Sequence, residues 1–215
     1  MLRGWGRVHA RYRDLGLGAR SYGFIRWSLC PFDRILPHVP EQGRLLDIGC
    51  GSGLWLTYLS LERPGLRLEG LDPDPRKLAM VRNADIPGLV LHRGFALDIP
   101  GGGFDCITII DVLCLLPDDE KRNVLQACRA ALRPGGLLIA KEIDVRPRWK
   151  FWPAAAEEFI AVLLVGLTQG DRLHFQSLED LAADFAGAGL DEVSSQRVDR
   201  GYAHPHVLVH GRRRG

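Results

Sequence analysis

The sequence lacks a long uninterrupted apolar run. The longest one, residues 159–167, has nine residues, whereas a helix needs roughly 20 apolar residues to cross a membrane. The N-terminus also lacks the continuous apolar block of a signal peptide, because arginines are scattered among its apolar residues. We therefore predict neither a transmembrane helix nor a secretory signal.

Cysteine is scarce, and its spacing offers no pairs. The chain has five cysteines, an odd number, and no C-x-x-C motif. This pattern argues against a disulfide framework and against a zinc site. We therefore expect no metal and a reducing compartment, the cytoplasm. The cysteines are Cys30, Cys50, Cys106, Cys114 and Cys128.

The chain as a whole has no excess of one charge. Its 28 basic and 26 acidic residues leave a net charge of +2, which is poor support for nucleic-acid binding. Residues 1–26 differ, because six arginines stand against the single acid Asp14 and give that segment a charge of +5. With 215 residues, 46% of them hydrophobic, the chain is typical of one globular domain with a small extension.

Short β-type runs alternate with helical patterns from residue 44 onward. This alternation is typical of a parallel sheet covered by helices on both faces, so the predicted fold class is α/β with a doubly wound sheet. We predict strands at residues 44–48, 67–71, 88–92, 104–110, 136–143, 190–198 and 206–210. We predict helices at residues 54–62, 74–83, 118–132, 154–167 and 178–188.

The most informative segment is LLDIGCGSG at residues 45–53, where a predicted strand runs into three alternating glycines and then a helix. Glycines let the backbone turn sharply and let a ligand approach where any Cβ would collide. The amides at the following helix N-terminus can receive an anionic group. Asp72 stands 19 residues beyond Gly53, where a carboxylate can accept hydrogen bonds from both ribose hydroxyls. The segment therefore predicts a nucleoside-containing ligand.

Two kinds of cofactor share this outline, and the details separate them. A dinucleotide site has G-x-G-x-x-G, but Leu54 occupies the place of the third glycine, and Asp47 would lie beside a pyrophosphate. The pattern D-x-G-x-G-x-G instead resembles motif I of the class I S-adenosylmethionine-dependent methyltransferases. Further segments resemble that family in the same order: GLDPDP at 70–75, FD at 104–105 with DVL at 111–113, and LRPGGLL at 132–138. Together these motifs extend over roughly half the chain.

The resemblance implies a mostly parallel, seven-stranded Rossmann-like sheet with an antiparallel last strand. Residues 1–40 would form an N-terminal helical lid and residues 41–215 the S-adenosylmethionine-binding methyltransferase domain. The implied activity is transfer of a methyl group from S-adenosyl-L-methionine to a small-molecule acceptor, which leaves S-adenosyl-L-homocysteine. The cofactor-binding residues implied are Asp47, Gly49, Cys50, Gly51, Gly53, Asp72, Pro73, Phe95, Ala96 and Asp111.

One position departs from the family pattern. Many members carry an aspartate at the place of Phe95, where it bonds the adenine amino group. Phe95 offers only an apolar wall, which leaves backbone amides or Asp98 to recognise adenine. The alternative is that Phe95 points into the core. Asp111 is expected to touch the cofactor or to shape the pocket.

The catalytic residues are the least visible in the sequence. The sulfonium methyl is already activated, so its transfer needs chiefly in-line positioning and a base only where the acceptor loses a proton. Family topology places the acceptor pocket at the carboxyl ends of the strands. The candidate base there is His204 or His206, with Tyr202 or Glu142 as its orienting partner. His174 is the second candidate base.

The N-terminal segment predicts an amphipathic helix. On a helical wheel one side carries Leu2, Trp5, Val8, Tyr12 and Leu15, and arginines lie opposite. We expect the apolar side to pack over the acceptor pocket as a lid, which suits a hydrophobic, aromatic or lipid-like acceptor. Contact of this basic helix with a membrane surface, an acidic acceptor or nucleic acid is the alternative.

Two other functions are compatible with the predicted fold. A nicotinamide-dependent oxidoreductase would bind a reduced dinucleotide in place of S-adenosylmethionine. A non-catalytic nucleoside-binding protein would bind the cofactor without turnover. The accepting atom and the oligomeric state are left open by the sequence.

Overall fold

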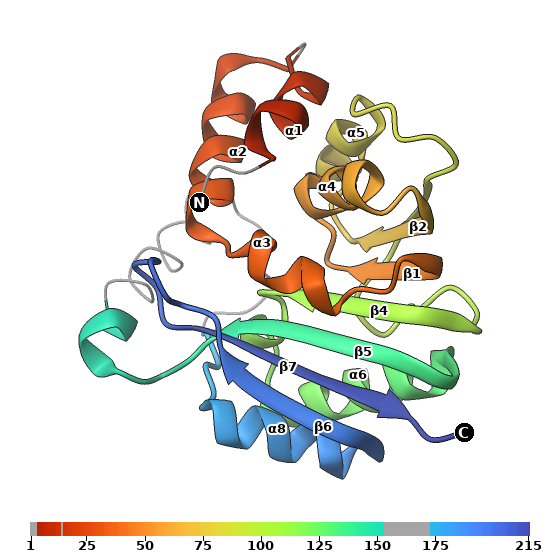
Figure 1. Cartoon of the computed structure of the whole chain (residues 1–215), viewed down its shortest axis with the longest axis vertical. Coiled ribbons are helices and arrows are strands. Elements are labelled where there is room, and N and C mark those ends of the chain that lie inside the picture. The colour runs from red at the N-terminus through yellow and green to blue at the C-terminus, as the bar shows by residue number, and fades with distance from the viewer. Residues whose placement is uncertain (1–3, 14, 153–172) are drawn as a thin grey trace.

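The computed structural model describes residues 4–13, 15–152 and 173–215, which form one twisted sheet with helices on both faces (Figure 1). Within these residues seven strands lie in the order β3-β2-β1-β4-β5-β7-β6. β7 is antiparallel to both of its neighbours, and the other pairs are parallel. The predicted fold class is therefore confirmed. The strands are β1 (Gln42–Ile48), β2 (Gly65–Asp72), β3 (Val90–Arg93), β4 (Phe104–Ile110), β5 (Leu132–Ile143), β6 (Leu190–Arg197) and β7 (His206–Arg213).

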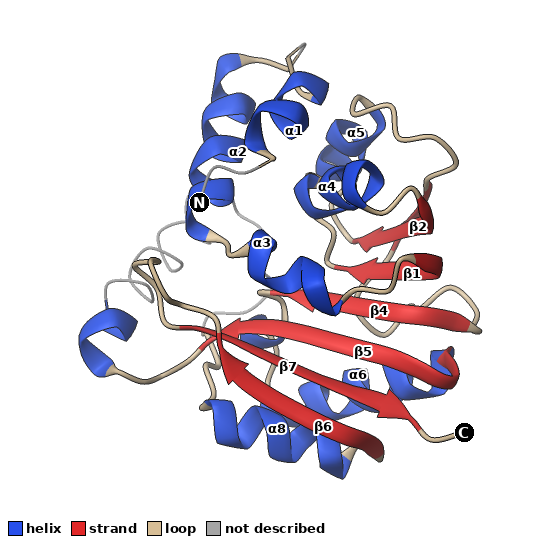
Figure 2. Cartoon of the chain, viewed as in Figure 1, coloured by secondary structure: helices blue, strands red, loops and turns tan. Residues whose placement is uncertain are grey.

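The central strands are buried on both faces, so successive residues enter two different hydrophobic cores. Leu45 of β1 packs in a core with α4 (Leu54–Glu62) and α5 (Pro75–Arg82). Its neighbour Leu46 packs in a core with α6 (Asp118–Ala131) and α8 (Leu178–Gly187). Since adjacent side chains of a strand point to opposite faces, these helix pairs cover opposite sides of the sheet (Figure 2).

The helix boundaries follow local capping signals. Asp74 accepts a hydrogen bond from the Arg76 amide and precedes a proline in the first turn of α5. Ser177 caps α8 in the same way, through the Asp180 amide. α6 begins with three acidic residues, which favour a helix N-terminus. These three helices, and α4, agree with the predicted ones to within a residue at either end.

The N-terminal segment forms more than the one helix predicted. It comprises α1 (Trp5–Arg11), α2 (Leu17–Leu29), α3 (Phe32–Ile35) and the short 3-10 helix η1 (Leu36–His38). The apolar side of α1 is buried, but it packs on α4: the Tyr12 hydroxyl lies 2.8 Å from Thr57 Oγ1 and donates to the Ser52 carbonyl at 2.8 Å. This extension shares a hydrophobic core with α4 and α5. It is α2 that reaches the carboxyl end of β4, where Arg26 binds Asp111.

Two predicted elements need comment. β5 begins at Leu132 and not at 136, because Leu132 already pairs with Phe104 before a register shift in the ladder. The predicted helix at 154–167 lies outside the described residues. Among the described residues no helix is long and apolar enough to cross a membrane.

Candidate functional site

The turn after β1 contains three glycines, of which two pack tightly against neighbouring side chains and the third lies beside open space. Gly49, Gly51 and Gly53 all have positive φ, of 71°, 55° and 77°, a region that glycine enters without steric cost. A Cβ on Gly49 would collide with Val112 Cγ2, and one on Gly53 would lie 2.6 Å from Val81 Cγ1. A Cβ on Gly51 would meet only a carbonyl oxygen, at 3.9 Å. Gly51 therefore faces the space that a ligand can enter.

Asp72, at the end of β2, turns its carboxylate toward this turn. One oxygen accepts a hydrogen bond from the Gly51 amide and the other from the Asp74 amide, both at 2.9 Å. A carboxylate has about four lone-pair sites, so acceptor capacity remains for hydroxyl donors such as those of a ribose. The residues at this turn fit an adenosyl cofactor, with an acidic group beside an open glycine. Pro73, next in the chain, is exposed.

Asp47 lies beneath the glycine turn and is almost completely buried. Thr108 of β4 donates a hydrogen bond of 2.7 Å to it. Burial, with a smaller contribution from the nearby Asp72 carboxylate, raises the pKa of Asp47 to about 7. A cationic group of a ligand placed near Asp47 would stabilise the charged form of its carboxylate. Burial also raises the pKa of the Cys50 thiol far above its ordinary value, which keeps this cysteine of the turn neutral and unreactive.

Phe95 lies in the turn after β3, and its side chain is 54% exposed. The alternative in which it points into the core is therefore wrong. Its amide donates to Asp98 Oδ2 at 2.8 Å, and the Asp98 amide donates to the Phe95 carbonyl at 2.9 Å. The Gly94 amide ties this turn to the Asp72 carbonyl at 3.3 Å. Phe95, the adjacent Ala96 and the Asp98 carboxylate are thus held on the same side of the sheet edge as Asp72.

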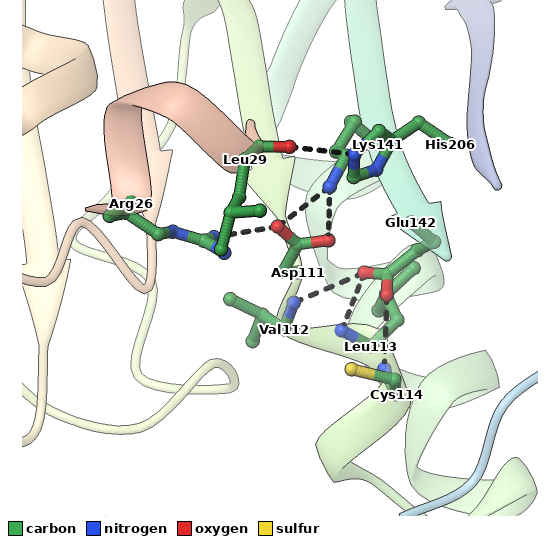
Figure 3. Close-up of polar contacts among 9 residues, drawn as sticks. All are labelled: Arg26, Leu29, Asp111, Val112, Leu113, Cys114, Lys141, Glu142 and His206. Atoms are coloured by element: carbon green, nitrogen blue, oxygen red, sulfur yellow. Dashed lines mark hydrogen bonds and ion pairs between the residues drawn. The ribbon is translucent and has the colours of Figure 1, made fainter. Parts of the chain in front are cut away.

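Asp111 follows β4 and is the centre of a buried ion-pair cluster (Figure 3). Lys141 Nζ lies 2.6 and 2.8 Å from its two oxygens, and Arg26 of α2 lies 2.6 Å from one of them. Burial opposes ionisation, but Lys141 and Arg26 hold the pKa of Asp111 well below its usual range. Asp111 is expected from the sequence to touch the cofactor or to shape the pocket, and its two cationic partners are not predicted. The available signal for Lys141 was a lysine that directly follows the apolar run GLLIA at residues 136–140 of a buried strand.

Glu142, the next residue of β5, binds backbone amides and not a histidine. Its Oε1 accepts from the Val112 amide at 3.1 Å and the Leu113 amide at 2.9 Å, and Oε2 accepts from the Cys114 amide at 3.4 Å. Burial, and after it the Asp111 charge, raise the pKa of Glu142 to about 7. His174 lies on this side as well, since its amide donates to the Cys114 carbonyl at 2.7 Å.

His206, at the start of β7, has one ring nitrogen engaged and the other without a partner. Nε2 donates to the Leu29 carbonyl at 2.7 Å, which assigns the proton to Nε2. Nδ1 is buried and has no hydrogen-bond partner within the described structure. Burial, and after it the Lys141 charge, lower the pKa of His206 well below its usual value. The imidazole is therefore neutral and offers a lone pair at Nδ1.

The one described hydrogen bond of the His206 ring goes to Leu29 and to none of the other predicted catalytic residues, although the His206 amide donates to the His204 carbonyl at 3.0 Å. Tyr202 donates to Asp33 Oδ1 at 2.8 Å and presents its ring edge to His206, with 5.7 Å between centroids. The His204 ring also lies 5.7 Å from that of His206. The Leu29 carbonyl, and neither Tyr202 nor Glu142, accepts the hydrogen bond from His206 Nε2. The fold brings α2 over β7, and that contact has no local signature in the sequence.

Comparisons with known proteins give a consistent picture. The family model described as "Methyltransferase domain" matches residues 30–195. A ubiquinone biosynthesis O-methyltransferase of Cereibacter sphaeroides is 33% identical over 198 residues, which cover 88% of this chain and 78% of that protein. A demethylmenaquinone methyltransferase of Thermus thermophilus is 32% identical over 200 residues, covering 85% and 89%.

Solved structures share the fold. The methyltransferase SibL in its apo form superposes with a TM-score of 0.71 at 22% identity, covering 96% of this chain and 62% of that one. PigF with S-adenosylhomocysteine superposes with a TM-score of 0.70 at 20% identity, covering 90% and 57%. This chain therefore spans less than two thirds of either longer protein, and at these identities the likeness establishes the fold.

Proposed function

Because this chain belongs to the methyltransferase domain family, as a class I S-adenosylmethionine-dependent methyltransferase, we propose that it methylates a hydroxyl oxygen on a small, apolar, quinone-like ring. The names of the two relatives support a ring acceptor of this kind. The observation that carries the choice of oxygen is His206 Nδ1, which has no hydrogen-bond partner among the described residues and lies near the Lys141 ammonium. The nicotinamide-dependent alternative lacks support from any of these relatives.

The cofactor would be held by the residues of the glycine turn and the neighbouring strand ends. Gly51 has no side chain, so the cofactor can approach its backbone. Asp72 accepts hydrogen bonds from the ribose hydroxyls, and Asp47 faces the cationic amino end of the cofactor. Phe95 forms a wall for the adenine ring, and the Asp98 carboxylate accepts from its amino group. When bound, S-adenosylmethionine supplies an electrophilic methyl group on a sulfonium.

The acceptor hydroxyl would donate a hydrogen bond to His206 Nδ1. The hydroxyl proton becomes strongly acidic as its oxygen forms the new bond to carbon, so a weakly basic imidazole is sufficient to receive it. An ammonium has three N–H donors, and Asp111 accepts two from Lys141. The positive charge of Lys141 would also lower the pKa of the acceptor hydroxyl, which favours transfer of its proton to His206 Nδ1. In this arrangement Tyr202 and His204 shape the wall around His206.

The experiment is an acceptor screen with a labelled methyl donor. We expect label in hydroxylated apolar rings and none in the same rings with the hydroxyl already methylated. Label only in amines or thiols would overturn the choice of oxygen. Binding of S-adenosylhomocysteine with no turnover on any acceptor would favour the non-catalytic alternative.

We further propose that the protein touches a membrane surface through α2, where an apolar acceptor would reside. Leu17, Phe24 and Ile25 of α2 are 79%, 45% and 52% exposed. α1 is a poorer candidate, since its apolar side is buried on α4 and Arg7 pairs with Glu62. The five buried, free thiols fit a protein that works in the reducing cytoplasm.

A further inference from the structure

The turn that follows Asp111 is held by a side chain from the neighbouring strand. The 3-10 helix η2 (Leu113–Leu115) begins there, and no side chain of its own cap, Val112, bonds its amides. Glu142 supplies the missing acceptor, because its carboxylate binds the amides of three successive residues, 112–114. Consecutive amides of this kind form a binding site for an anionic group. Figure 3 shows the carboxylate facing these amides.

The same turn packs directly against the cofactor loop. A Cβ on Gly49 would collide with Val112 Cγ2, so the valine methyl occupies the space beside the Gly49 backbone. Gly49 is in the left-handed region at φ 71°, and its amide donates to the Leu71 carbonyl at 2.7 Å. Val112 therefore supports the first glycine of the loop from the side of β4.

Two successive residues of β5 hold this turn from opposite faces of the sheet. Lys141 points to one face and binds Asp111, and the Asp111 amide donates to the Lys141 carbonyl at 2.9 Å. Glu142 points to the other face and binds residues 112–114. Since side chains alternate along a strand, β5 fixes both the start of the turn and its amides.

We propose that Glu142 is a positioning residue for the methyl donor, acting through Val112 on Gly49. This rests on the proposed function, since it concerns the same cofactor site. Glu142 then has no contact with substrate. Its loss loosens the 112–114 turn, removes the support of Gly49 and weakens cofactor binding while the acceptor site on the Lys141 face stays intact.

The test compares Glu142→Ala and Glu142→Gln, with Glu41→Gln as the matched control on an exposed glutamate. We expect Glu142→Ala to weaken S-adenosylhomocysteine binding by about tenfold, as lost buried hydrogen bonds imply. The KM for the methyl donor should rise equally, and the KM for the acceptor should stay within about twofold. Glu142→Gln keeps one acceptor oxygen and should recover most of the affinity, and Glu41→Gln should match the wild type.

A second variant keeps the proposal testable where Glu142→Ala does not fold. Val112→Ala retains the backbone amides bound by Glu142 and removes only the methyl groups that face Gly49, so it should weaken S-adenosylhomocysteine binding by about threefold. Unchanged affinity in a folded Glu142→Ala or in Val112→Ala would overturn the proposal, as would a rise confined to the acceptor KM. If the wild type itself binds no S-adenosylhomocysteine, the proposed function fails first.

Discussion

The amide of Gly51 donates a hydrogen bond of 2.9 Å to the carboxylate of Asp72. Gly51 follows β1, and Asp72 is the last residue of the adjacent parallel strand β2; the ladder pairs Ile48 with Leu71. Because both strands end at the same edge of the sheet, the glycine turn and the acidic residue meet there. This contact joins the two sequence motifs that carry the cofactor assignment.

Asp72→Ala should weaken cofactor binding by at least about tenfold, because each charge-assisted hydrogen bond to a ribose hydroxyl contributes on the order of 1.5–3 kcal/mol. Calorimetric titration with S-adenosylhomocysteine measures the effect. Asp74→Ala is the control, since it removes a neighbouring carboxylate that caps α5 and should leave affinity unchanged. Equal affinities for the two variants would contradict the assignment of Asp72.

Gly51→Val should abolish cofactor binding and leave the chain folded. The new side chain would occupy the open space beside the turn, and the positive φ of 55° adds strain of about 1–2 kcal/mol. Gly49→Ala is the informative comparison. Its Cβ would collide with Val112, so the melting temperature should fall further than in Gly51→Val. A Gly51→Val protein that binds S-adenosylhomocysteine normally would show that the ligand lies elsewhere.

Affinity for S-adenosylmethionine should increase as the pH rises through about 7. Burial raises the pKa of Asp47 to about 7, so Asp47 is protonated below that pH and cannot attract the cationic amino end. Above it the carboxylate is charged, and binding tightens. Asp47→Asn should show a flatter profile in calorimetry between about pH 6 and 8. Glu142 titrates in the same range but is present in both proteins, so the difference between them reports on Asp47.

His206→Phe should lower kcat by about a hundredfold and leave S-adenosylhomocysteine affinity unchanged, because it removes the nitrogen that receives the acceptor proton. Steady-state kinetics with the best acceptor of the screen measure this. Tyr202→Phe keeps the aromatic ring and loses only the hydrogen bond to Asp33, so its kcat should change by less than about tenfold. A larger loss in Tyr202→Phe than in His206→Phe would exclude His206 as the acceptor contact.

The double change Phe24→Ser and Ile25→Ser should reduce co-sedimentation with lipid vesicles, because it removes two exposed apolar side chains of α2. Arg11→Ser is the matched control on α1, where the guanidinium binds the Asp85 carbonyl. We expect the control to sediment like the wild type. If Arg11→Ser loses more co-sedimentation than the double variant, the membrane contact would instead be made by the basic helix α1, as one alternative from the sequence holds.

Much of the cofactor site could be predicted from the sequence, since it depends on short-range signals. The turn LLDIGCGSG needs glycine at Gly49 and Gly53 because their positive φ and close neighbours exclude a side chain. The strand alternation and the helix caps at Asp74 and Ser177 are equally local. These patterns predicted the strands of the sheet and the position of Asp72, whereas the antiparallel last strand was implied by the family resemblance.

The contacts at the proposed acceptor site were decided by tertiary packing. Arg26 meets Asp111 across 85 residues and Tyr202 meets Asp33 across 169, and neither pair shares a local pattern. Glu142 looked like a partner for a histidine, but the alternation of β5 turns it to the face where residues 112–114 present their amides. The sequence determined which groups the chain carries and how each element begins and ends. The packing of the elements decided which partner each of these side chains contacts. A buried charge needs a partner, and only the groups that the fold places beside it are available.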